Sequence, residues 1–108
     1  MELNWNDSSN LHILNVSGNV DSNTTSEMSL AIETRLKEAS KDIVIDFSGV
    51  DYISSAGLRV VIKTHHMQTS AGKKMMLCSL KDYVYEIFEM SGLVNLLDIR
   101  KDIESALS

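Results

Sequence analysis

Short apolar runs, bounded by polar turn residues, recur along this chain and predict five β-strands. These runs span residues 2–6, 11–16, 42–47, 75–79 and 96–99. The run Ile43-Val44-Ile45 has no polar alternation, which is typical of a strand buried on both faces of a parallel sheet. Only the turn residues 7–10 separate the first two runs, and so short a connection favours an antiparallel pair.

Apolar residues at helical spacing predict two long helices between these strands. The first begins after Thr24 and Glu27, which have the spacing of a capping box, and ends near residue 40. Within it, Glu33 and Lys37 are four residues apart and can pair on the outer face. The second helix is expected over residues 55–70. Its inward stripe is expected to contain Leu58, Val61, Ile62 and His65.

Two shorter helices complete the pattern. One is expected over residues 82–91, with Ser79 and Asp82 positioned to cap it, and the other over residues 102–107. Strands and helices alternate from residue 11 onward, which favours an α/β fold with right-handed crossovers. We expect a single domain over residues 1–108: a mostly parallel β-sheet with an antiparallel first strand, packed with about four helices.

Composition and charge narrow the class of protein. The chain is 44% hydrophobic and 23% charged, as in a soluble globular domain. Its formal charge of −5, without an evident basic helix face, disfavours direct binding of nucleic acid. It has no apolar run long enough to span a bilayer and no signal peptide, so a cytoplasmic protein without a membrane partner is expected. A single cysteine, Cys78, fits a reducing compartment.

The segment with the most distinctive chemistry follows the strand at residues 42–47. A short connection there ends in Ser54 and Ser55, directly at the predicted start of the second helix. The first N–H groups of a helix lack intrahelical partners, and the helix dipole makes this end positive. A phosphate on either hydroxyl would lie at a favourable anion site. Alternatively, one serine simply caps the helix.

STAS domains, in particular those of bacterial anti-sigma factor antagonists, have a signature that resembles the segment Asp-Phe-Ser-Gly-Val-Asp-Tyr-Ile-Ser-Ser-Ala-Gly-Leu-Arg-Val-Val, residues 46–61. The turn Gly18-Asn19-Val20-Asp21 is also similar to one in that family. In these proteins the serine two residues before the glycine is phosphorylated by a partner kinase. Alignment on Gly57 makes that serine Ser55. Some members carry Asp immediately before it, where this chain has Ser54, so Ser54 is the alternative.

The resemblance implies a phosphorylation-switched regulator of transcription that works by partner switching. Unphosphorylated, such a protein binds an anti-sigma factor with serine kinase activity and so releases a sigma factor. The kinase uses ATP and Mg²⁺ to phosphorylate the serine, and a phosphatase resets the switch. The chain itself would be substrate and ligand rather than an enzyme, and it would need no cofactor.

Two loops are expected at the carboxyl edge of the sheet, over residues 18–23 and 48–54, where partners of open α/β sheets meet the strands. Asp21 and Asp51 are then expected on the same edge as the serines, although an Asp in a turn often only bonds its own backbone. The predicted partner surface consists of Asp21, Asp51, Ser54, Ser55, Gly57, Arg59 and Lys63.

Other classes of protein find less support. The sequence contains neither the phosphate-binding Gly-rich loop with Lys of P-loop nucleotide hydrolases nor the Gly-x-Gly-x-x-Gly of dinucleotide-binding folds. It also has no hydroxyl residue and base at a spacing that would indicate a catalytic pair. The spacing of His12, His65, His66 and Cys78 does not indicate a metal site. Two alternatives stay open: a non-switching STAS subunit of a larger transport or signalling assembly, and a small-molecule-binding module at the same edge.

Overall fold

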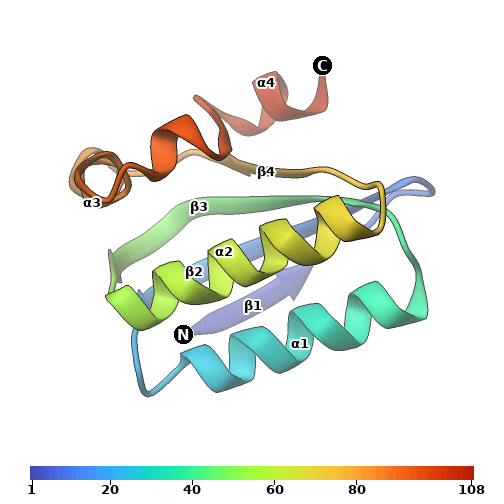
Figure 1. The fold of residues 1–108 in the computed structure, drawn as a ribbon, viewed down its shortest axis with the longest axis horizontal. Coiled ribbons are helices and arrows are strands. Elements are labelled where there is room, and N and C mark those ends of the chain that lie inside the picture. The colour runs from blue at the N-terminus through green and yellow to red at the C-terminus, as the bar shows by residue number, and fades with distance from the viewer.

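The computed structural model describes residues 1–108 and shows one five-stranded sheet covered by helices (Figure 1). The elements in chain order are β1 (Glu2–Trp5), β2 (Leu11–Val20), α1 (Thr25–Glu38), β3 (Asp42–Ile53), α2 (Ser55–Ser70), β4 (Met75–Cys78), α3 (Asp82–Met90), a 3₁₀ helix (Leu93–Asn95), β5 (Asp98–Arg100) and α4 (Ile103–Leu107). The strands lie in the order β1-β2-β3-β4-β5. The β1–β2 pair is antiparallel and the other three pairs are parallel, which confirms the predicted α/β class.

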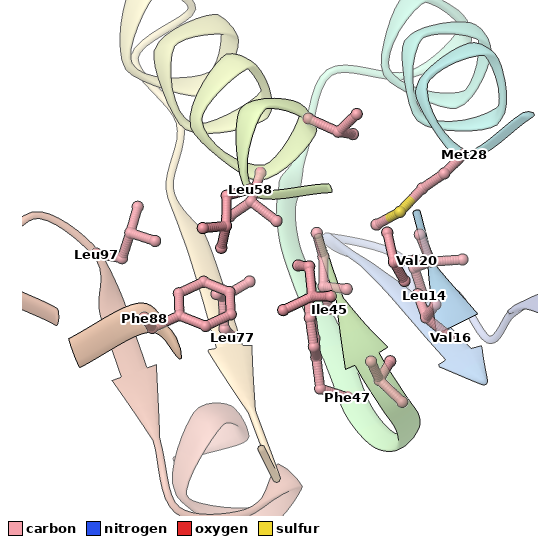
Figure 2. Close-up of a cluster of buried hydrophobic side chains, with 14 of the residues drawn as sticks. Leu14, Val16, Val20, Met28, Ile45, Phe47, Leu58, Leu77, Phe88 and Leu97 are labelled. Atoms are coloured by element: carbon pink, nitrogen blue, oxygen red, sulfur yellow. The ribbon is translucent and has the colours of Figure 1, made fainter. Parts of the chain in front are cut away.

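The main core lies between one face of the sheet and helices α1, α2 and α3. Met28 of α1, Leu58 of α2 and Phe88 of α3 pack with strand residues that include Ile45 and Phe47 (Figure 2). The rings of Phe47 and Phe88 meet edge-on, with their centroids 6.0 Å apart, an arrangement favoured by aromatic quadrupoles. This packing anchors all three helices to the same face of the sheet.

The opposite face of the sheet has a smaller core. Val44 and Cys78, which alternate with the residues of the main core along their strands, pack there with Ala106 of α4. Cys78 is fully buried, and burial raises the pKa of its thiol. A buried thiol of this kind is a packing group, in agreement with its predicted place in a strand.

The two central strands are longer than the sequence predicts. β2 continues through Gly18 to Val20, and β3 continues through Gly49 to Ile53, although both segments are predicted as loops. The pair stays together through two register shifts, or bulges, one between Asn15 and Ser17 and one between Gly18 and Asn19. A Cβ on Gly49 would lie 2.7 Å from the Cβ of Ser17, so only glycine permits this approach. The edge loop after β2 therefore begins at residue 21, and a single residue, Ser54, joins β3 to α2.

Two predicted helix caps are wrong. The Thr24 hydroxyl donates to the carbonyl of Asn19, 3.0 Å away, and accepts from the backbone N–H of Asp21, so it stabilises the turn instead of α1. Ser79 has a positive φ of 61° and lies too early to cap α3, which follows Lys81 without a side-chain cap. The last strand begins two residues later than predicted and ends one residue later, because the turn around the 3₁₀ helix Leu93–Asn95 continues to Leu97.

His12 has a structural role in this fold. Its side chain is 1% exposed, and its two ring nitrogens lie 2.6 Å from a carboxylate oxygen of Asp7 and 2.7 Å from the carbonyl of Ala39. These bonds join the β1–β2 turn to the end of α1. No group of three His, Cys, Asp or Glu side chains in the molecule is arranged to hold a metal ion. None of the helices combines the length and apolar character that a membrane span requires.

Candidate functional site

The start of α2 distinguishes the two adjacent serines. Ser54 is the N-cap residue, with extended backbone angles, and its Oγ accepts a hydrogen bond from the backbone N–H of Gly57 at 3.3 Å. Ser55 is the first helical residue and is exposed. Its side chain makes no hydrogen bond within the chain. One serine therefore serves the helix, while the other presents a free hydroxyl at the positive helix end.

Close packing against the strand ends holds this helix start in place. The backbone N–H of Ser54 donates to the carbonyl of Val20 at 2.9 Å, so the cap residue extends the β2–β3 pairing. Gly57 is buried, and a Cβ there would lie 2.6 Å from the Cγ1 of Ile53 and 2.9 Å from the Val20 carbonyl oxygen. Gly57 thus brings the first turn of α2 onto the sheet edge, and a partner could not reach it directly.

The two predicted carboxylates lie near this edge but have local partners. Asp21 follows Val20, which pairs with Ile53, so its backbone lies beside the start of α2. One of its carboxylate oxygens accepts from the backbone N–H of Asn23 at 2.9 Å, which confirms the expected turn role. Asp51, an exposed residue of β3, pairs with the Lys81 ammonium at 2.6 Å and raises the pKa of Lys81 through that hydrogen bond. Neither carboxylate bonds to Ser55.

The two predicted cations differ in their surroundings. Arg59, one turn after Ser55, is exposed and makes no ion pair. Lys63 forms an ion pair with Glu33 of α1, and its hydrogen bond holds the pKa of that carboxyl below its usual value. The predicted pairing of Glu33 with Lys37 is therefore replaced by a contact between two helices, which a helix-local rule cannot foresee.

Beside the two cations, a shallow groove of about 400 Å³ separates α1 from α2. Arg59, Lys63 and Leu30 are among its lining residues. Leu30 is 66% exposed, and Tyr52 at the end of β3 is 48% exposed. The sequence patterns did not predict that these two side chains are exposed. For Leu30 the exposure could have been predicted, because this residue lies off the apolar stripe of its helix. For Tyr52 it could not, because its exposure depends on the bulges in β3.

The cap assignment predicts different costs for two adjacent substitutions. Ser54→Ala removes an N-cap acceptor and should lower the free energy of unfolding by about 1 kcal/mol. Ser55→Ala removes an exposed hydroxyl without a partner and should change it by less than about 0.5 kcal/mol. Urea denaturation of the two variants measures this difference. Equal losses, or a greater loss for Ser55→Ala, would contradict the assignment of the cap to Ser54.

Comparison with known proteins gives consistent matches. The family model described as STAS domain matches residues 3–106. The protein BtrV of Bordetella bronchiseptica, which bears the name of an anti-sigma factor antagonist, is 32% identical over 89 residues, 82% of this chain and 77% of that protein. A crystal structure of a Thermotoga maritima protein, also named as an anti-sigma factor antagonist, superposes with a TM-score of 0.92 at 18% identity, covering 97% of this chain and 91% of that one.

A further match is the Bacillus cell fate determinant SpoIIAA in its phosphorylated form. It superposes with a TM-score of 0.75 at 14% identity and covers 97% of this chain and 96% of that one. At such identities the solved structures establish the common fold, which is the five-stranded sheet with helices described above.

Proposed function

This chain belongs to the STAS domain family, and from that premise we propose that it is an anti-sigma factor antagonist switched by phosphorylation of Ser55. In its unphosphorylated form it binds an anti-sigma factor and so releases a sigma factor. The anti-sigma factor is a serine kinase, which phosphorylates the chain with ATP and Mg²⁺, and a phosphatase reverses the modification. The chain acts as ligand and substrate in this cycle, and it catalyses no step itself.

The proposal rests on one observation, which is that the two serines have different roles in the structure. Ser55 is exposed at the first position of α2 and is free of hydrogen bonds, whereas Ser54 holds the cap. A kinase can therefore reach the Ser55 hydroxyl without disturbing the helix. The phosphate, which carries roughly −1.5 to −2 charges at neutral pH, would lie at the positive end of the helix dipole. The modification thus alters the surface while leaving the fold intact.

The proposed partner surface is the carboxyl edge of β2 and β3 together with the first turns of α2. Ser55, Arg59 and Lys63 are its exposed helix residues. Lys63 is paired with Glu33, Asp51 is paired with Lys81, and Asp21 accepts from the backbone of Asn23. Ser54 and Gly57 contribute indirectly, since one caps the helix and the other allows its close approach to the sheet. Negative charge placed at the centre of such a surface costs desolvation and repels nearby acids of the partner.

A reconstitution with the cognate anti-sigma and sigma factors tests this function. The unphosphorylated chain is expected to displace the sigma factor from the anti-sigma factor in a pull-down. Arg59→Glu should weaken displacement several-fold while leaving the melting temperature nearly unchanged, because exposed substitutions usually cost little stability. Lys101→Glu, with the same charge change beyond β5, serves as the control. Binding without displacement would favour the non-switching subunit instead.

A further inference from the structure

Charge is strongly segregated along this chain. Residues 52–81 contain none of the fifteen acidic residues, but they hold five of the ten Lys and Arg residues. These five are Arg59, Lys63, Lys73, Lys74 and Lys81. The net charge of −5 conceals this segregation, and two of these five cations, Arg59 and Lys63, lie on α2 itself. The α2 region is locally cationic on an otherwise acidic molecule.

The cations of α2 lie on its outer face. Arg59, Lys63, His66 and Ser70 follow one another at intervals of four, three and four residues, which places them in one row along a helix. We call this row the α2 stripe. Together with Ile62 and Met67, its members line a shallow depression of about 820 Å³. Ser55 precedes Arg59 by four residues and so lies at the head of the same row.

The geometry points to the α2 stripe as a docking surface for an acidic, amphipathic protein segment, such as a helix of the partner with carboxylates and apolar side chains on one face. Charge complementarity favours an acidic occupant at the Ser55 end of the stripe, because Arg59 is exposed there without an ion-pair partner, whereas Lys63 is already paired with Glu33 of α1. The apolar side chains of Ile62 and Met67 offer contact area beside the cations. Nucleic acid is disfavoured because its phosphate backbone requires several clustered free cations, whereas Arg59 alone can pair with one carboxylate of a protein segment.

This inference deepens the proposed function and rests on it for the link to regulation. A phosphate on Ser55 would lie one helical turn from Arg59, the cation of the stripe that has no ion-pair partner. It would compete for Arg59 and repel the acidic segment at the head of the stripe. Phosphorylation would then release the partner by charge alone, without a change of fold.

An NMR titration of the unphosphorylated chain tests the docking surface without any kinase. The probes are two synthetic helical peptides that share a row of leucines and carry either glutamates or lysines beside it. The glutamate peptide is expected to shift backbone amide signals between Arg59 and Ser70, and added salt should weaken its binding. Arg59→Gln should weaken binding roughly threefold, as expected for one exposed charge pair. Lys101→Gln, the matched control beyond β5, should leave binding unchanged.

Three results would overturn the docking surface: equal shifts with both peptides, shifts confined to α3, or self-association of the chain through the stripe. Equivalent shifts with a short duplex DNA would overturn the choice of an acidic protein segment. Because no kinase is present, failure of this titration is distinct from failure of Ser55 phosphorylation, which is measured separately. Ser55→Asp should also weaken binding of the glutamate peptide. An unchanged affinity would contradict the proposal that phosphorylation of Ser55 controls this surface.

Discussion

Replacing Gly57 with alanine is expected to lower the free energy of unfolding by about 2–3 kcal/mol, the cost of overpacking a tight core position. The direction is unusual, because alanine in a helix normally gains about 1 kcal/mol over glycine. Here the added Cβ would lie 2.6 Å from the Cγ1 of Ile53 and 2.9 Å from the carbonyl oxygen of Val20. The helix start must move away from the sheet to make room.

Urea denaturation measures this effect, and Gly72→Ala provides a matched control. Gly72 has a φ of +70° but no atom within 4 Å of an added Cβ, so its replacement should cost only the backbone strain, about 1 kcal/mol. A Gly57→Ala variant as stable as the parent would show that α2 does not approach the sheet this closely. If Gly57→Ala loses more stability than the control, the same variant should also bind its partner more weakly, because Ser54 and Ser55 move with the helix start.

Replacing Ser55 with aspartate is expected to weaken binding of the anti-sigma factor by at least about tenfold, or ~1.4 kcal/mol, while the protein stays folded. An acid is tolerated at this position because the helix end is positive. The same charge at an interface loses contacts and repels acidic groups of the partner. Ser55→Ala keeps a small, helix-compatible side chain, and it should bind the partner as the parent does.

Calorimetric titration of the anti-sigma factor with these variants gives the affinities. Ser9→Asp is the control, since it adds the same charge to the exposed β1–β2 turn. It should leave binding unchanged. If Ser9→Asp weakens binding as much as Ser55→Asp, net charge rather than position governs the affinity, and the assigned interface is wrong.

Helical periodicity and the Ser-Ser-Ala-Gly-Leu segment were sufficient to predict α2 over residues 55–70 and the place of both serines near its start. Local rules could not assign the cap, because Ser54 and Ser55 are chemically identical. The choice depends on the hydrogen bond of Ser54 Oγ with Gly57 and on the pairing of its backbone with Val20. This second contact joins two strands that are distant in sequence.

The ends of β2 and β3, which hold the site, were harder to predict for the same reason. Gly18 and Gly49 have the character of turn residues, yet the structure places them inside β2 and β3. Gly18 adopts a positive φ, and Gly49 allows the close approach of Ser17. Both glycines lie at bulges, and these bulges allow the two strands to stay paired up to their ends. Likewise, Glu33 pairs with Lys63 on a neighbouring helix because packing brings α1 and α2 together. Each departure results from a long-range contact.

The most direct test of the central claim is to find where the cognate kinase places a phosphate. The unphosphorylated chain is incubated with its anti-sigma factor, ATP and Mg²⁺, and the modified residue is located by mass spectrometry. Phosphate is expected on Ser55 in the parent and in Ser54→Ala, and it should be absent from Ser55→Ala. Phosphate on Ser54, or none on the parent with a kinase shown to be active, would contradict the proposed switch.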